Sequence, residues 1–344
     1  MSKSFNLAII GVGIGRQHLR GALGVPGVNI AALCDVDVAR AGAIVEEFEL
    51  SGTRVVADYR DLLDMPDLDA VSVCVPNALH ASITIACLSA GLHVLCEKPL
   101  ATNAADAQTI VDAARDNNRA CMVGQLLRFR DDVRALKKRA REIGTPYYAR
   151  AVARRAHGIP KWGSWFTQKE MSGGGPLIDT GVHIIDLSWW LAGCPRPLSA
   201  SATAYGALGA RKIGLGMGGI GDPNGKFDVE DLAAGLIRFE GDFSIHFESS
   251  WALYADGDAR YCHIHGTEGA LLWSDEPRLM TSDGTVEAIH VEPGDAWRNE
   301  IAHFVDSIRN GIAPQPDAEA GSTIMKMLDA LYQSAREGKE VEIV

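Results

Sequence analysis

The sequence lacks several features that would assign it to a class at once. No apolar run approaches the ~18 residues of a membrane-spanning helix, and the amino terminus has no apolar stretch typical of a signal peptide. The charges sum to −11 and form no basic stripe, which argues against a nucleic-acid partner. The seven cysteines are an odd number without a CxxC pair and lie mostly in apolar runs, as expected of buried thiols in a reducing compartment. We therefore expect a cytoplasmic protein without membrane or nucleic-acid contacts.

The length and the pattern of the first part predict two domains. A single core stops growing near roughly 250–300 residues, and the chain has 344. In the first 125 residues, predicted strands cover 6–10, 29–34, 54–57, 70–75, 93–96 and 119–123, and predicted helices between them include 38–48, 81–90 and 104–117. Such alternation requires parallel strands with crossover helices, so residues 1–126 are predicted to form a doubly wound Rossmann domain.

The remainder, residues 127–344, has a different order of predicted strands and helices. Predicted strands cover 146–156, 198–205, 231–239, 243–252, 260–265 and 270–273, a hairpin turns at 282–284, and predicted helices cover 132–143, 176–191, 297–309 and 318–337. Long strands joined by tight turns indicate one large, mainly antiparallel sheet in an α+β domain. The glycine-rich segment 206–225 is either a lid or disordered.

A glycine-rich turn follows the first predicted strand and opens a helix. In Gly11-Val12-Gly13-Ile14-Gly15, small residues let backbone N–H groups approach a pyrophosphate beside a helix N-terminus. The GxGxG spacing is shorter than GxGxxG, so the alternative is an ordinary tight turn. The second predicted strand ends at Asp35, whose carboxylate can accept hydrogen bonds from both ribose hydroxyls of NAD and repels the 2′-phosphate of NADP. Asp35 could instead cap a helix, a role open to Asp37; NAD is favoured over NADP.

Polar residues follow the fourth and fifth predicted strands. The fourth strand leads into Pro76-Asn77, and the fifth ends in Glu97-Lys98-Pro99. Ligands bind beyond the carboxyl ends of the strands in open α/β sheets, so Lys98 is expected near the nicotinamide. The alternative for Lys98 is a surface ion pair.

The most informative segment runs from residue 172 to 186. Three glycines and Pro176 introduce a helix in which Asp179, His183 and Asp186 are spaced i, i+4 and i+7, on one stripe. The other positions are largely apolar, so the helix is predicted to be buried with its polar stripe facing partners or a cleft. A histidine titrates near neutrality, as a general base must. The alternative is a structural hydrogen-bond network.

Further candidates flank these segments. Arg128 follows the last predicted strand of the first domain, and Arg155 precedes Trp165, which could stack on a sugar ring. The alternatives are a solvated rim for Arg155 and a core or interface position for Trp162 and Trp165. His263 and His265 alternate on one strand without a third ligand, so no metal site is predicted.

These motifs together resemble the Gfo/Idh/MocA oxidoreductases, the family of glucose–fructose oxidoreductase and inositol dehydrogenase. The resemblance extends over nearly the whole chain and is carried by the glycine turn, by residues 75–77 with His80, and by the segments 90–100 and 173–186. It implies an open-faced sheet that often mediates oligomers, here a homodimer or homotetramer. It implies a catalytic set of Lys98, Asp179 and His183. The expected cofactor-binding residues are Gly11, Gly13, Ile14, Gly15, Asp35, Pro76, Asn77, His80, Glu97 and Lys98. The expected substrate-binding residues are Lys98, Arg128, Arg155, Trp165, Asp179 and His183.

The expected activity is hydride transfer between the nicotinamide and a secondary hydroxyl or carbonyl of a sugar, a sugar derivative or an inositol. In this hypothesis His183 removes the hydroxyl proton, Lys98 stabilises the developing alkoxide, and Asp179 holds His183 or Lys98 in place. Two alternatives remain: an NAD-using enzyme that cleaves glycosides by transient oxidation and elimination, and a non-catalytic NAD-binding sugar sensor.

Overall fold

The computed structural model describes residues 4–216 and 218–344 and divides the chain into two compact units. The first unit contains the residues up to Phe129 together with Gly294–Ser322, and the second contains Arg130–Pro293 with Thr323–Val344. Within the described ranges, no helix has both the length and the apolar character needed to cross a membrane.

The first unit contains a parallel sheet of six strands in the order β3-β2-β1-β4-β5-β6. Its strands are β1 (Phe5–Ile10), β2 (Val28–Cys34), β3 (Arg54–Val56), β4 (Ala70–Val73), β5 (His93–Glu97) and β6 (Cys121–Gly124). Its helices are α1 (Gly15–Leu23), α2 (Val38–Glu47), α3 (Arg60–Leu63), α4 (His80–Ser89), α5 (Ala104–Asp116) and α9 (Ala296–Arg309). The strand order is that of a dinucleotide-binding Rossmann sheet, so the predicted fold of this part is confirmed.

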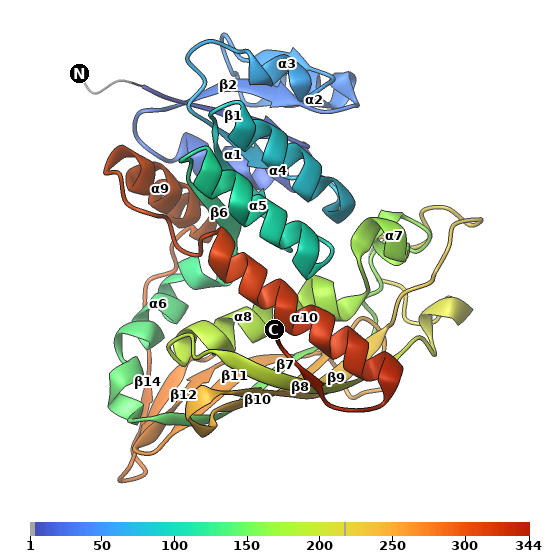
Figure 1. The fold of residues 1–344 in the computed structure, drawn as a ribbon, viewed down its shortest axis with the longest axis vertical. Helices are drawn as coiled ribbons and strands as arrows, with labels where there is room; N and C mark the ends of the chain where they lie inside the picture. Colours follow the sequence, from blue (N-terminus) through green and yellow to red (C-terminus); the bar gives the residue numbers. More distant parts are fainter. Residues whose placement is uncertain (1–3, 217) are drawn as a thin grey trace. The chain divides into compact units, whose positions relative to one another are not determined.

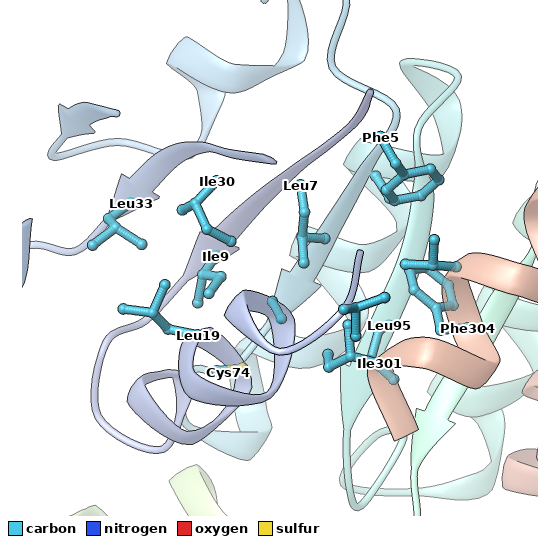
Figure 2. Packing of buried hydrophobic residues seen from close by; sticks show 14 of the residues in the cluster. Phe5, Leu7, Ile9, Leu19, Ile30, Leu33, Cys74, Leu95, Ile301 and Phe304 are labelled. Atoms are coloured by element: carbon cyan, nitrogen blue, oxygen red, sulfur yellow. The ribbon is translucent and has the colours of Figure 1, made fainter. Parts of the chain in front are cut away.

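The core of the first unit includes a helix that lies far along the chain. Helix α9 packs against α1, and Figure 2 shows Ile301 and Phe304 among the same buried side chains as Phe5, Leu7 and Leu95. The division of the chain therefore differs from a single boundary between residues 126 and 127. Residues 294–322 return to the first unit because α9 buries its apolar face in that core, which residues 1–126 alone would leave exposed.

The second unit contains a sheet of nine strands in the order β14-β13-β12-β11-β7-β10-β9-β8-β15. Its strands are β7 (Pro146–Arg154), β8 (Pro197–Tyr205), β9 (Leu232–Phe239), β10 (Ser244–Ser250), β11 (Ala259–Gly266), β12 (Gly269–Trp273), β13 (Arg278–Thr281), β14 (Val286–Ala288) and β15 (Val341–Glu342). Neighbouring strands are antiparallel except β7 and β10, which are parallel. The predicted mainly antiparallel sheet is confirmed.

Helices cover one face of this second sheet. The helices of the unit are α6 (Asp131–Lys138), α7 (Lys169–Ser172), α8 (Val182–Leu191) and the latter part of α10 (Ala318–Glu337). Helix α8 packs on β7, β10 and β11, and in Figure 1 it lies on the same side of the sheet as that part of α10. The opposite face carries half-buried side chains such as Tyr261, His263 and His265, whose alternation on β11 matches the sequence pattern.

The described residues of the glycine-rich segment 206–225 contact an earlier part of the second unit; Met217 lies outside the described residues. The backbone of the segment pairs with the chain around Ile159 and Trp162, with hydrogen bonds from Ile159 to the Gly214 carbonyl (3.1 Å) and from Trp162 to the Gly219 carbonyl (2.9 Å). The choice between a lid and disorder stays a prediction. A Cβ on Gly214, Gly216 or Gly225 would meet a neighbouring part of the chain within 3 Å, so close packing accounts for these glycines.

Candidate functional site

The turn after β1 contains two glycines that leave no room for a side chain and one that is open. Gly11 has φ +88°, and a Cβ there would lie 2.4 Å from the Cys74 carbonyl oxygen. A Cβ on Gly15 would lie 2.7 Å from Ile9, so this residue lets α1 approach β1. A Cβ on Gly13 would meet nothing within 4 Å, which leaves the backbone open to a ligand. The three glycines thus provide a tight turn, an open approach and close helix packing despite the shortened spacing.

Asp35 lies at the end of β2 beside this turn. It is buried, and its Oδ2 accepts a hydrogen bond from the Val12 amide at 2.8 Å, while its Oδ1 accepts one from the Asp37 amide at 2.9 Å. Arg40 donates to both oxygens, at 2.7 and 2.8 Å. Burial raises the pKa of Asp35, but these hydrogen bonds outweigh it, so the net shift is downward and the group is an anion at neutral pH. Asp37, not Asp35, caps α2, accepting from the Arg40 amide.

His80 ties the ends of two neighbouring strands together. It is buried, its Nδ1 lies 2.6 Å from the Pro99 carbonyl oxygen, and its Nε2 lies 2.8 Å from the Val75 carbonyl oxygen. Both ring nitrogens are therefore occupied by the backbone, which makes His80 a brace for the loops that carry Asn77 and Lys98. We therefore expect His80 to support cofactor binding indirectly, by holding these two loops in place.

Glu97 belongs to a buried polar network. Its Oε1 lies 2.8 Å from Nε2 of His18, whose Nδ1 lies 2.8 Å from the Ser72 hydroxyl, and its Oε2 accepts from the Lys98 amide at 3.1 Å. Burial alone would lower the pKa of His18, but Cys74 and Glu97 raise it well above its ordinary value. Burial alone would raise the pKa of Glu97, and His18 lowers it. An imidazolium–carboxylate pair therefore supports the backbone of Lys98.

A second acid lies near this pair. Glu300 of α9 is fully buried, and within the described parts of the chain neither of its carboxyl oxygens has a hydrogen-bond partner. Burial raises the pKa of Glu300 to about 8, an effect that His18 opposes and Glu97 reinforces. The acid is thus protonated at neutral pH.

In the second unit, the predicted helix of residues 176–191 begins with a π-helical turn. The π turn covers Leu177–Gly181 and is followed by α8. Asp179 lies in the π turn and His183 in the first turn of α8, and both side chains are half-buried, whereas Asp186 is fully buried next to Cys262 of the sheet. The π turn is a rare structure that occurs often at functional sites. Asp179 and His183 therefore remain candidates, and the position of Asp186 favours its packing role.

The glycines before the π turn fit around a buried acid. Glu230 accepts hydrogen bonds from the Gly175 amide (2.9 Å), the Leu177 amide (3.1 Å) and the Tyr332 hydroxyl (2.9 Å). A Cβ on Gly174 would lie 2.0 Å from the Tyr332 hydroxyl, and one on Gly175 would lie 2.0 Å from the Glu230 carbonyl oxygen. Burial raises the pKa of Glu230 despite these donors. The glycine run is therefore needed for close packing around Glu230.

The remaining candidates have diverse surroundings. Arg128 is buried in the first unit, on the turn after β6, and Arg155 is exposed just after β7. Trp165 is half-buried and stacks on Phe166 with ring centroids 3.8 Å apart. Trp162 is buried, and its indole N–H donates to the Gly209 carbonyl at 2.8 Å, so it occupies a core position, the alternative to stacking on a sugar. Among the described residues, no group of three or more His, Cys, Asp or Glu side chains could hold a metal ion.

Sequence reasoning missed several residues that shape these sites. They are His18, Glu230, Trp251, Glu300 and Tyr332. A histidine on the apolar face of the first predicted helix was the one visible signal, because a buried imidazole requires partners. The others lie far along the chain from the residues that they contact, and no local pattern marks them.

Comparison with known families assigns the chain to a class of oxidoreductases. Residues 5–125 match the NAD-binding Rossmann fold of the Gfo/Idh/MocA oxidoreductase family, and residues 139–343 match the C-terminal alpha/beta domain of that family. The chain belongs to this family, and it is an oxidoreductase acting on CH–OH groups.

Individual relatives include D-glucoside 3-dehydrogenase of Escherichia coli, 31% identical over 99% of this chain and 98% of its own. Levoglucosan dehydrogenase of Pseudarthrobacter phenanthrenivorans is 30% identical over 83% of each chain. Among solved structures, a levoglucosan dehydrogenase complex with NADH and levoglucosan superimposes with a TM-score of 0.88, covering 99% of this chain and all of the other. That structure is 23% identical and supports the fold.

Proposed function

We propose that this protein is an NAD-dependent dehydrogenase that oxidises a secondary hydroxyl of a sugar, a sugar derivative or an inositol, or reduces the corresponding carbonyl. The observation that carries the proposal is that one chain contains both an open glycine turn beside an anionic Asp35, in the first unit, and a buried helix that begins in a π turn and carries Asp179 and His183, in the second. The names of the relatives support a carbohydrate substrate, because they act on glucosides and levoglucosan.

The residues of the first unit fit a dinucleotide. The pyrophosphate would lie against Gly13 and Ile14 at the N-terminus of α1, where α1 has no acidic residue in its first turn to repel it. Asp35 would accept from the adenosine ribose, and Pro76, Asn77 and Lys98 follow strand ends on the edge where the nicotinamide would lie. His80 and Glu97 would hold those loops in place through their buried contacts. When bound, the nicotinamide supplies an acceptor for the hydride.

The chain's own groups would carry the proton chemistry. A ring nitrogen of His183 accepts the proton of the substrate hydroxyl as the carbon–hydrogen bond breaks and the carbonyl forms. The Lys98 ammonium donates to the same oxygen and stabilises its developing negative charge. Asp179 orients the imidazole or the ammonium. Arg128, Arg155 and Trp165 are the proposed contacts to the rest of the substrate.

The face of the second sheet opposite α8 is the proposed interface of a homodimer or homotetramer. Half-buried rings lie along β7 and β11 on this face, including the pairs Tyr261–His263 and Tyr148–His265, with centroids 4.6 and 5.7 Å apart. Elution of the pure protein at its monomer mass in light-scattering chromatography would refute this assembly.

The test of the function is a panel of sugars, glycosides and inositols, each assayed at 340 nm with NAD and with NADP. Net NADH formation from a free polyol is the expected result. Glycosidic cleavage without net NADH would show the eliminating enzyme instead, and NAD binding without turnover of any compound would show a sensor. His183→Ala is expected to abolish turnover, with His290→Ala, an exposed histidine, as its control. Turnover by His183→Ala at the level of the control would end the assignment of His183.

A further inference from the structure

Trp251 follows β10 and forms the centre of a small hydrophobic cluster in the second unit. It is fully buried, and the cluster also contains Ile159, Trp162, Val229 and Ala252. Its indole N–H donates to Oδ2 of Asp179 at 3.0 Å. A hydrogen bond from a rigid, buried ring to a carboxylate fixes the position of the accepting oxygen.

The end of β10 holds the π turn at more than one point. The Ser249 hydroxyl donates to the Pro176 carbonyl at 2.9 Å and lies 2.8 Å from the Thr180 hydroxyl. The backbone at residue 176 and the side chains at 179 and 180 are thus all held by residues 249–251. The π turn therefore has a defined geometry that β10 imposes.

The same tryptophan is linked to the glycine-rich segment 206–225. The Trp251 amide donates to the Asp231 carbonyl at 2.9 Å, and Oδ2 of Asp231 accepts from the amides of Leu208 and Gly209, both at 2.7 Å. Leu208 also packs against the cluster that contains Trp251. Hydrogen bonds therefore connect Leu208 and Gly209 through Asp231 to the backbone of Trp251, whose indole donates to the Asp179 carboxylate.

We propose that Trp251 is a positioning residue for the reaction: its indole N–H holds the Asp179 carboxylate in its working orientation. The inference rests on the proposed function, because it assigns a consequence to the orientation of Asp179. Trp251 has no contact with the reacting atoms in this scheme and acts through Asp179.

The experiment compares Trp251→Phe with Trp162→Phe in the full-length protein. Both changes remove one indole N–H from the same cluster, but the N–H of Trp162 donates to the Gly209 carbonyl and not to Asp179. Similar losses of thermal stability are expected. Turnover should separate them: Trp251→Phe is expected to lower kcat about 10-fold, the size of one charge-assisted hydrogen bond, whereas Trp162→Phe should stay within about 2-fold of wild type.

Two further readouts distinguish positioning from a structural effect. The loss in Trp251→Phe should appear in kcat, with the KM for the substrate within about 2-fold of wild type, since Asp179 orients a group that acts in the chemical step. In an Asp179→Ala background, adding Trp251→Phe should change kcat by less than about 2-fold, because the group through which Trp251 acts is gone. If Trp251→Phe does not fold, benzothienylalanine at position 251 keeps the ring shape and lacks the N–H.

Each result has a defined meaning. Wild-type turnover by Asp179→Ala would refute the proposed role of Asp179 and this inference with it. A reduced but measurable kcat in Asp179→Ala, together with equal kcat for Trp251→Phe and Trp162→Phe, would refute the positioning role alone. Additive losses in the double variant would show that Trp251 acts only through stability, which also overturns the inference.

Discussion

Arg40 is predicted to control the choice between NAD and NADP. Asp35 has about four lone-pair positions, and the amides of Val12 and Asp37 together with two contacts from Arg40 occupy them. The ribose of NAD can therefore bind Asp35 only if the Arg40 side chain, which is 51% exposed, moves away. A displaced Arg40 would remain close to the ribose, where it can contact the 2′-phosphate of NADP.

The magnitudes follow from the exposure of this pair. Breaking a half-exposed ion pair costs about 0.2–1 kcal/mol, so Arg40→Ala should lower the KM for NAD by up to about 5-fold. A hydrogen bond from a charged donor to a phosphate contributes about 1.5–3 kcal/mol, and the lower end applies at this exposure, so the KM for NADP should rise about 10-fold.

The assay is initial-rate kinetics with both cofactors, and titration calorimetry for binding. Arg60→Ala is the matched control, since Arg60 also pairs with an aspartate of the first unit, Asp58, but at an exposed site. An unchanged ratio of the two cofactor KM values in Arg40→Ala would refute the reasoning.

Other consequences can be tested in the first unit. Gly13→Ala should leave the free energy of unfolding within about 1 kcal/mol of wild type, since the added Cβ meets no protein atom, but should weaken NAD binding at least about 10-fold. Gly11→Ala should instead lower the free energy of unfolding by roughly 1–3 kcal/mol. Equal stability of the two variants would contradict this. The pKa of Glu300 is raised to about 8 from an ordinary 4.5, so between these pH values the folded state keeps a proton that the unfolded state has lost. The free energy of unfolding should therefore decline as pH rises from 4.5 towards 8, by about 1.4 kcal/mol per pH unit at most. Glu300→Gln should flatten that decline and raise the melting temperature at pH 8–9, and denaturation curves with the wild-type slope would show that Glu300 does not titrate in this range.

Much of the fold could be predicted because its signals are local. The alternation of strands and helices up to residue 124 and the tight turns between later strands reflect periodicities of a few residues, and the observed elements agree with them to within a few residues at each end. The glycine turn, Asp35 and Lys98 could be placed because the carboxyl ends of parallel strands share one edge of a sheet.

The sequence by itself determined the class of fold, the cofactor turn and the residues with suitable chemistry, because these depend on spacing along the chain. Only the tertiary structure decided which partners fix those residues. Arg40 on Asp35, His18 on Glu97, Glu230 on the Gly175 amide and Trp251 on Asp179 are contacts between separate elements. No short pattern encodes such contacts, since packing of the whole unit sets which distant side chains meet and how deeply each charge is buried.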